Sequence, residues 1–457
     1  MWNRWDTARR TNWPGIPFPR HQRSSLAKYT RPFGSLAPPK MPRDLIVVNC
    51  KQLVTLAGPP IPRVGEDLNN LGIIRDGALW ARDGKIERIG TWEEIKVVAP
   101  ADADIIDAED RIVLPGFVDA HTHLVFGGSR ADEFERRALG ESYQSIAASG
   151  GGIRSTVRQT RAATELELLI SAKRRAGWLL RNGTTTAEIK SGYGLALEHE
   201  TKMLRIARSL GEIGTLRVVG TFLGAHEFPD EFRDRRDDYV ELLIKEMLPA
   251  IANERLAEYA DVFCEPHIFD TEVAFRIMTA ASRLGFGLRM HVDQLSLSGG
   301  AQLAARLKAA TADHLEQTDE AGMLALRDAG VQPVLLPGSV YALGLQRYPA
   351  ARRMVELGLP IVLATDLNPG SSPTPSIPMV LSLAVTQMKL SVAEAISAAT
   401  INAAYSLKRG HEIGSLEPGK YADLVIHDCE DYRELTYYFG VEPARQVFIG
   451  GESVYER

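Results

Sequence analysis

The residues in this chain that could bind a metal ion are histidines and an aspartate at the ends of short apolar segments. His121 and His123 end one such segment. Side chains alternate along a strand with a period of two, so both imidazoles project to one face. They are separated along the strand by about twice the rise per residue. That spacing suits two nitrogen ligands of one ion, although two polar histidines could also simply end a strand.

Other candidate ligands follow the same rule. His226, His291 and His314 stand at or just past the ends of three further apolar segments, and Asp366 ends the last one. The C-terminal strand ends form the functional face of a β/α barrel, so these side chains are expected to converge there. As alternatives, each histidine could be a core or loop-closing residue, and Asp366 could belong to the turn at Asn368.

Three imidazoles and a carboxylate around one ion leave a coordination position for water, as catalytic sites do. Such an ion lowers the pKa of its water from about 15.7 toward about 7, and Asp366 could accept the proton. The expected cofactor is one divalent or trivalent ion per chain. Histidine and carboxylate ligands leave zinc and iron both open.

These residues need a frame of parallel strands. Short apolar segments alternate with longer helical stretches, which predicts an α/β fold with a (β/α)8 TIM-type barrel. An open doubly wound sheet is less favoured, because no GxGxxG follows the first strand. The eight expected strands are Ile112–His121, Thr184–Lys190, Leu216–Leu223, Asp261–Pro266, Leu288–Val292, Ala310–His314, Gln332–Leu336 and Pro360–Asp366.

The chain divides into three expected parts. Residues 112–408 form the barrel, and residues 43–111 with 409–457 form a small β-sandwich domain built from both chain ends. Residues 1–42 carry seven prolines, which break helices, and are expected to be a flexible extension. A tag or an upstream translation start before Met41 are the alternatives.

Composition limits the function. A net charge of −5 leaves no excess of positive charge for nucleic acid or an anionic membrane, so a small-molecule substrate is expected. The three cysteines are far apart and indicate neither a disulfide framework nor a thiolate zinc site. No apolar run approaches the roughly 18 residues of a membrane span, and no signal peptide opens the chain. We expect a cytoplasmic protein.

Four segments carry a resemblance to a known family. They read HTHLVFGGSR at 121–130, EIKSGYGL at 188–195, GAH at 224–226 and TDLNPG at 365–370. Over roughly residues 44–457 the chain resembles the amidohydrolase superfamily and, within it, the imidazolonepropionases. The resemblance implies a homodimer that hydrolyses the ring amide of 4-imidazolone-5-propanoate to N-formimidoyl-L-glutamate in histidine degradation.

The resemblance also implies roles for individual residues. The metal ligands would be His121, His123, His291 and Asp366. From the chemistry of the residues themselves we expect Asp366, His314 and His226 to be catalytic, with Asp366 taking a proton from water and His314 assisting the oxyanion or shuttling a proton. Substrate contacts would come from Arg130, Tyr193, His226, Gln294, Asn368, Gly370 and Ser371.

Physical chemistry supports some of these roles and leaves others open. The planar guanidinium of Arg130 suits a propionate carboxylate, and the glycines beside Tyr193 permit close approach of a ligand. A solvated loop arginine and a packed loop tyrosine are the alternatives. In related binuclear hydrolases the lysine that bridges two metals lies on the fourth strand. Lys190 lies on the second expected strand, so we expect one metal and a buried or paired lysine. Glu265 and His267 receive no role beyond support of the site.

Gln294 bears on the reaction type. Related deaminases have a glutamate three residues after the metal-binding histidine, and an amide cannot transfer protons as a carboxylic acid can. Which group is the general base is therefore open. A deaminase, another cyclic-amide hydrolase of the superfamily and a non-catalytic scaffold are the alternative functions.

Overall fold

The computed structural model describes residues 44–457 apart from 142–144 and 147–148, so the extension expected over residues 1–42 lies outside the described residues. Eight parallel strands follow one another in sequence order and form the barrel, which confirms the predicted fold class. They are β6 (Phe117–Thr122), β7 (Thr184–Lys190), β8 (Arg217–Ala225), β9 (Tyr259–Cys264), β10 (Gly287–Val292), β11 (Thr311–His314), β12 (Gln332–Leu335) and β13 (Val362–Leu363).

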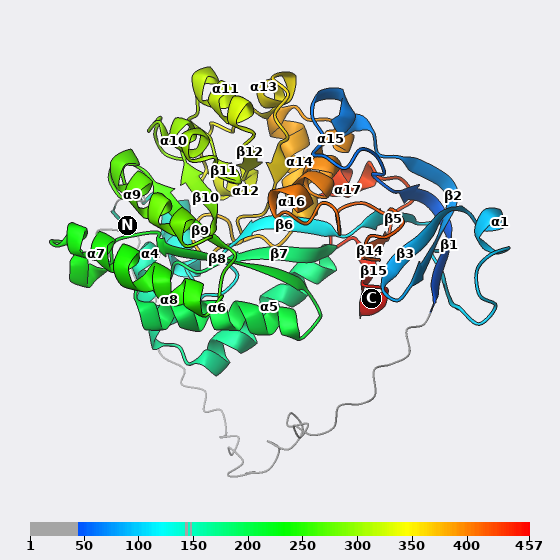
Figure 1. The fold of residues 1–457 in the computed structure, drawn as a ribbon, viewed down its shortest axis with the longest axis horizontal. Coiled ribbons are helices and arrows are strands. Elements are labelled where there is room, and N and C mark those ends of the chain that lie inside the picture. Colours follow the sequence, from blue (N-terminus) through cyan, green and yellow to red (C-terminus); the bar gives the residue numbers. More distant parts are fainter. Residues whose placement is uncertain (1–43, 142–144, 147–148) are drawn as a thin grey trace, which may run out of the picture. The chain divides into compact units, whose positions relative to one another are not determined.

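Helices cover the outside of these strands (Figure 1). The predicted capping boxes are present at Thr164 with Glu167 and at Ser391 with Glu394. Barrel helices are α2 (Ala131–Ala138), α4 (Ile153–Ala162), α5 (Glu165–Arg181), α6 (Leu197–Glu212), α7 (Arg236–Leu242), α8 (Leu248–Asn253), α9 (Thr271–Arg283), α10 (Gly300–Leu307), α11 (Glu320–Ala329), α12 (Pro337–Ala342), α13 (Ala351–Glu356), α14 (Ile377–Met388), α15 (Val392–Ala398) and α16 (Ile401–Ser406).

The second sheet is built from both ends of the described chain, as the sequence predicts. Strand β14 pairs antiparallel with β5, so that Val425 lies opposite Leu114. Its order is β16-β15-β14-β5-β1-β2-β3, with β4 beside β1. The strands are β1 (Leu45–Val54), β2 (Ile73–Arg82), β3 (Lys85–Thr91), β4 (Asp104–Asp107), β5 (Ile112–Pro115), β14 (Leu424–His427), β15 (Ala444–Ile449) and β16 (Glu452–Glu456), with short helices η2 (Gly65–Asn69), α1 (Trp92–Ile95) and α17 (Glu434–Tyr437).

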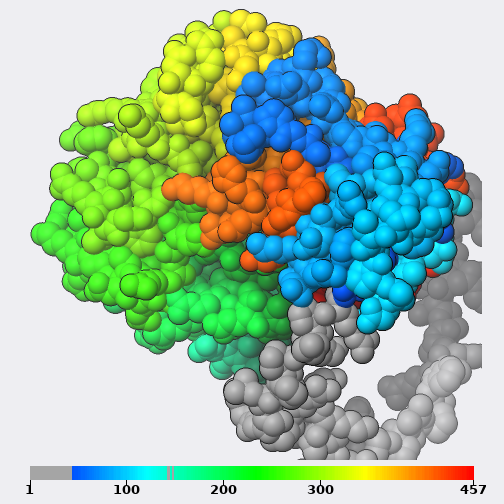
Figure 2. Space-filling model, turned by 45° about the vertical axis from the view of Figure 1, so that its right-hand side comes forward, coloured from blue at the N-terminus to red at the C-terminus, as the bar shows by residue number. Residues whose placement is uncertain are grey.

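The two ends of the chain also meet outside this sheet. Figure 2 shows the blue early residues against the orange late helices. There Ser397 of α15 donates a hydrogen bond to the carbonyl of Leu68 at 2.8 Å, and Ser391 donates one to Asn69 at 2.6 Å. The η2 segment is therefore fixed to the end of the barrel region.

The expected first barrel strand, Ile112–His121, is wrong as a single element. It divides at Gly116 into β5, which belongs to the second sheet, and β6, which opens the barrel. Only glycine fits the junction, because a Cβ there would overlap the side chain of Thr185. The continuous apolar run of residues 112–118 hides this change of sheet, since both strands are buried.

The barrel closes between its last and first strands through an irregular contact. The amide of Asp366 donates to the carbonyl of His121 at 3.0 Å, and the amide of His123 donates to the carbonyl of Leu367 at 2.9 Å. Strand β13 is only two residues long, shorter than the expected Pro360–Asp366, because residues beyond Leu363 pair in this irregular way. The closure brings His121 and His123, at the end of the first barrel strand, next to Asp366, which follows the last one.

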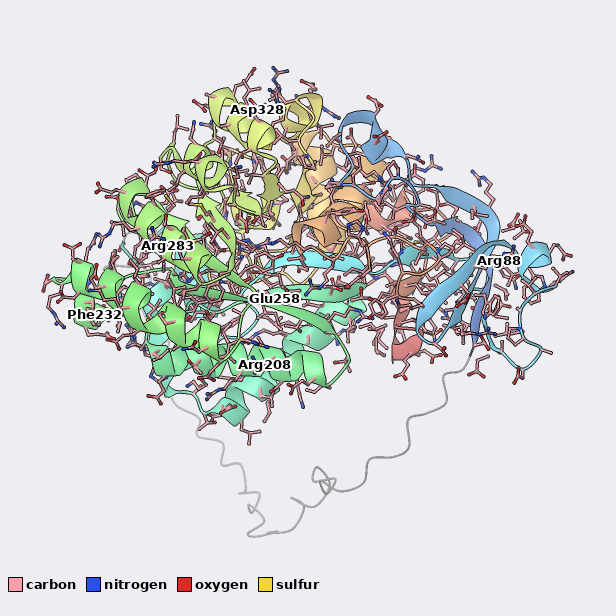
Figure 3. All side chains as sticks on the ribbon, viewed as in Figure 1. Arg88, Arg208, Phe232, Glu258, Arg283 and Asp328 are labelled. Atoms are coloured by element: carbon pink, nitrogen blue, oxygen red, sulfur yellow. The ribbon has the colours of Figure 1, made fainter. Side chains whose placement is uncertain are left out.

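Many charged side chains lie on the outer surface, whereas others, such as Lys190 and Asp261, are buried inside the barrel. Charged side chains such as Arg283 on α9 and Asp328 on α11 lie on the outer surface (Figure 3). The apolar faces of strands and helices pack in the core. Among the described residues, no helix is both long and apolar enough to cross a membrane.

Candidate metal and active site

A cluster of buried histidines surrounds Asp366 at the C-terminal ends of the barrel strands. The Nε2 atoms of His121 and His123 each lie 3.5 Å from Oδ1 of Asp366. The rings of His121 and His291 are 4.6 Å apart, and those of His291 and His314 are 5.3 Å apart. One potential ligand atom from each of His121, His123 and Asp366 lies within 4.8 Å of the others, and the same holds for His121, His291 and His314.

Carboxylates behind the cluster orient its imidazoles. Nδ1 of His121 lies 2.7 Å from Asp313 Oδ2, and Nδ1 of His291 lies 3.1 Å from Asp261 Oδ1. A proton on each Nδ1 donates to the carboxylate and leaves the Nε2 lone pair facing the centre. This is the arrangement in which metal-binding histidines are usually held.

The inner nitrogens of the cluster fit a metal ion. Nε2 of His121 and Nε2 of His291 are buried and have no hydrogen-bond partner among the described residues. Unsatisfied buried polar atoms are costly, and a cation between them would satisfy both. Burial, with Lys190 beside it, also lowers the pKa of His121 well below its ordinary value, which keeps the imidazole neutral as a ligand must be.

Lys190 is paired with carboxylates at the floor of the site. Its Nζ donates to Glu188 at 2.9 Å and to Asp261 at 2.8 Å, and all three side chains are fully buried. Burial lowers the pKa of Lys190, but Asp261 and Glu188 outweigh it and raise this pKa above its ordinary value. The structure thus contains the paired lysine expected from the sequence, in contact with the carboxylate that orients His291.

His314 faces the cluster from β11 in a strained conformation. Its φ of 80° is in the left-handed region, which costs a non-glycine residue of order 1–3 kcal/mol and is typical of functional sites. Nδ1 of His314 lies 3.4 Å from Glu316 Oε1. Burial opposes protonation, but Glu316 raises the pKa of His314 above its ordinary value.

The pKa of Asp366 is also raised, but here burial is the cause. Burial raises its pKa to about 6, while His314 and His291 limit the rise. Its backbone has a φ of 54° and is held by its neighbour Thr365, whose amide and hydroxyl donate to the buried Asp119 at 3.0 and 2.6 Å. Sequence reasoning missed Asp119, although it lies two residues before His121 on the same face of the strand.

An aromatic wall lies beside His123. The ring of His226 stacks on that of His123 at 5.1 Å, and the buried Tyr193 ring lies 5.7 Å from His123. Burial and His291 lower the pKa of His226 to about 3. The loop that carries Tyr193 is fixed by the buried carboxylate of Glu200, which accepts from the amides of Gly192, Gly194 and Leu195. Nothing in the sequence pattern marked Glu200.

Arg130 lies buried against the loop that follows Asp366. A Cβ on Gly370 would overlap its guanidinium, so the backbone of this loop passes directly beside it. Asn368 shapes the loop, because its Oδ1 accepts from the amides of Gly370 and Ser371 at 2.8 and 2.7 Å. Its Nδ2 donates to the carbonyl of Asp366 and to Ser371 Oγ.

The remaining candidates lie further out. Gln294 is half-buried, three residues after His291. Glu265 is buried and accepts from the amide of Leu295 and the hydroxyl of Ser296, so it holds the loop that contains Gln294. The side chain of His267 is exposed.

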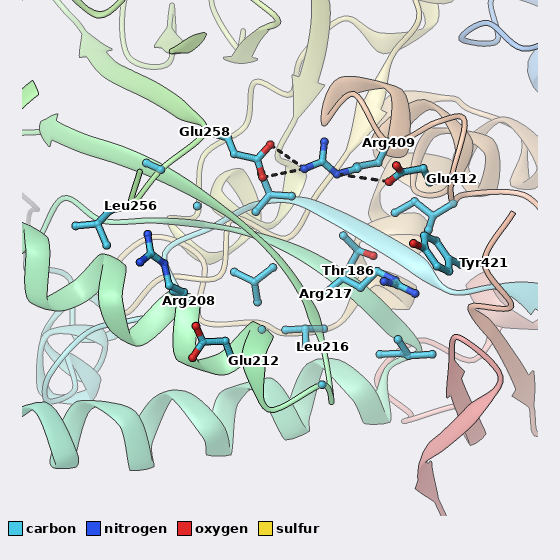
Figure 4. Close-up of a pocket in the computed structure, with 18 of the residues that line it drawn as sticks. Thr186, Arg208, Glu212, Leu216, Arg217, Leu256, Glu258, Arg409, Glu412 and Tyr421 are labelled. Carbon is cyan, nitrogen blue, oxygen red and sulfur yellow. Dashed lines mark hydrogen bonds and ion pairs between the residues drawn. The ribbon is translucent and has the colours of Figure 1, made fainter. Parts of the chain in front are cut away.

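A separate cavity of about 520 Å³ lies at the opposite end of the barrel strands. Figure 4 shows Arg409 between Glu258 and Glu412 in this cavity, with Arg217 and Tyr421 nearby. Arg409 donates to both oxygens of Glu258 at 2.8 Å. Arg217 is paired with Asp423 at 2.6 Å. The second pair joins the start of β8 to the residue just before β14 of the second sheet, at the end of the barrel strands opposite to the histidines.

Comparison with known proteins agrees with this barrel fold. The model of the amidohydrolase family matches residues 112–454. Solved structures of similar fold include guanine deaminase of E. coli, with a TM-score of 0.68 and 18% identity over 91% of this chain and 99% of that one. Another is an adenosine deaminase from Xanthomonas campestris with bound zinc, with a TM-score of 0.66 and 18% identity over 90% and 92%. The chain belongs to the amidohydrolase family.

Closer relatives specify the branch of that family. Imidazolonepropionase of Solibacter usitatus is 59% identical over 414 residues, which cover 91% of this chain and 99% of the relative. Imidazolonepropionase of Geobacillus kaustophilus is 45% identical over 416 residues, or 90% and 98% of the two chains. Within the amidohydrolases, this chain groups with the imidazolonepropionases.

Proposed function

We propose that the chain hydrolyses the ring amide of 4-imidazolone-5-propanoate to give N-formimidoyl-L-glutamate. The relatives named imidazolonepropionase support the substrate. The observation that carries the chemistry is the set of inward-facing, unpaired Nε2 atoms beside Asp366. His121, His123, His291 and Asp366 would hold one zinc or iron ion, which when bound supplies a Lewis acid and a water that ionises near neutral pH.

The chain's own residues would handle the protons. The carboxylate of Asp366, with a pKa of about 6, is suited to accept the proton of the attacking water near neutral pH. His314, protonated more readily than an ordinary histidine because of Glu316, would donate a hydrogen bond to the developing oxyanion. Arg130 would bind the propionate, and Tyr193 and His226 would flank the ring.

The proposal includes a homodimer and a cytoplasmic location.

The side chain of half-buried Gln294 is an amide and not a carboxylic acid. This favours amide hydrolysis over a deaminase mechanism, which needs a carboxylic acid at this position.

The direct test is to mix metal-loaded protein with 4-imidazolone-5-propanoate and follow loss of the ultraviolet absorbance of the ring. We expect loss of absorbance with formation of N-formimidoyl-L-glutamate and no ammonia. An unchanged spectrum would refute the proposal, and release of ammonia from a purine or pyrimidine instead would identify a deaminase.

A further inference from the structure

The guanidinium of Arg130 is held by one partner on one of its edges. Nε donates to Oε2 of Glu133 at 2.8 Å, and both side chains are buried. Nη2 lies 2.8 Å from the same oxygen but makes no hydrogen bond among the described residues. Oε2 can engage only one of the two N–H groups of Nη2, so the other N–H is a position that a ligand oxygen can fill.

Glu133 has a second contact that fixes its own position. Its Oε1 accepts from the amide of Gly152, one residue before α4, at 2.9 Å. The carboxylate therefore joins the start of α2 to the start of α4, and Arg130 is anchored to both. The backbone at Gly370 confines the guanidinium on another side, because it leaves no room for a Cβ.

The charges of this pair also matter for recognition. A buried guanidinium without a counter-ion would be expensive, and Glu133 offsets that cost before substrate binds. Because the Glu133 carboxylate lies on the edge formed by Nε and Nη2, the second N–H of Nη2 remains for an incoming carboxylate, and the fork does not have to reorganise.

We propose that Glu133 is the positioning residue of the carboxylate subsite: it sets the orientation of Arg130 and thereby the preference for substrates that carry a carboxylate side chain. This inference rests on the proposed function. Glu133 acts through Arg130 and does not touch the reacting ring.

The test compares Glu133→Gln with the wild type on two substrates. Glutamine has one acceptor oxygen where Glu133 uses two, so either Arg130 or Gly152 loses its partner. For 4-imidazolone-5-propanoate we expect KM to rise about tenfold or more, with kcat changed less than about threefold. For the same ring with a methyl group in place of the propionate, kcat/KM is expected to stay within about threefold of wild type.

Two further variants complete the experiment. Glu141→Gln breaks a matched pair, Arg136 with Glu141 at 2.6 Å, in a partly exposed position, and should leave both substrates unaffected. Gly370→Ala displaces the guanidinium without changing Glu133, and should also raise KM for the propionate substrate only. The two contacts at Arg130 are then probed by separate substitutions.

The possible outcomes separate the two proposals. An active wild type whose Glu133→Gln variant loses kcat equally on both substrates, or keeps its KM, would overturn the positioning role and leave the proposed function intact. A wild type that does not turn over imidazolonepropanoate would overturn both.

Discussion

At the Nδ1 atom of His121, the carboxylate of Asp313 decides which ring nitrogen is free for a metal. We expect Asp313→Asn to lower metal affinity about 10–100-fold, because a neutral amide orients and polarises the imidazole less well. Competition with a chelator of known affinity measures this change. Asp328→Asn, which alters an exposed partner of Arg327, is the control and should bind metal as the wild type does. Equal affinities of the two variants would contradict the role of Asp313.

Lys190 is held between Glu188 and Asp261 in a fully buried position. Replacing it by methionine leaves two buried carboxylates without their cation, so Lys190→Met should lower the free energy of unfolding by about 3–5 kcal/mol. Urea unfolding of metal-free protein measures this loss apart from any effect on metal binding. A loss below about 1 kcal/mol, the value typical of an exposed pair, would show that the site does not depend on the pairing.

The candidate site residues found from sequence share one property: they stand where an apolar strand ends. That rule located His121, His123, His291, His314 and Asp366, which the structure brings together. It could not locate Glu133 or Glu200, because these carboxylates hold loops by accepting from backbone amides, which leaves no mark at a strand end. Asp261 and Asp313 were within reach, since a carboxylate at an inward position of an apolar strand needs a buried partner.

Among the elements, the junction of β5 and β6 depends on Gly116 lying against Thr185. Gly116→Ala should destabilise the protein by roughly 1–3 kcal/mol through overpacking, as measured by urea unfolding. The double variant with Thr185→Ala removes most of the overlapping atoms. We therefore expect it to recover part of the loss, with a coupling energy of at least about 0.5 kcal/mol. Additive effects of the two changes would show that the junction tolerates a side chain.

The same junction shows what sequence can predict about elements. Strand β7 matches its expected range, because the threonine-rich, β-branched segment Thr184–Lys190 is bounded by Gly183 and a glycine-rich loop. The division at Gly116 could not be predicted, since an uninterrupted buried run carries no sign that its two halves pair in different sheets. The short β13 was overestimated for a related reason: hydrogen bonding with β6, not local propensity, ends it.

For the molecule as a whole, acid stability should depend on His427 in β14 of the second sheet, whose ring lies against the barrel strand β6. Its ring is 5.7 Å from that of Phe117, and neither ring nitrogen has a partner among the described residues. Burial lowers the pKa of His427 from 6.5 to about 3. Between these values the unfolded chain binds the proton and the folded one does not, so stability falls as the pH falls.

Between pH 7 and pH 5 this single group should cost about 2 kcal/mol of unfolding free energy. The variant His427→Phe keeps a ring next to Phe117 but cannot be protonated. From pH 7 to pH 5 its unfolding free energy should therefore fall by about 2 kcal/mol less than that of the wild type. Urea unfolding at pH 7, 6 and 5 measures both slopes, with His267→Gln, a change at an exposed histidine, as the control expected to match wild type. If the unfolding free energies of His427→Phe and wild type change equally with pH, His427 has a proton acceptor in the folded state. The contact between the second sheet and the barrel would then not be sensitive to acid at this residue.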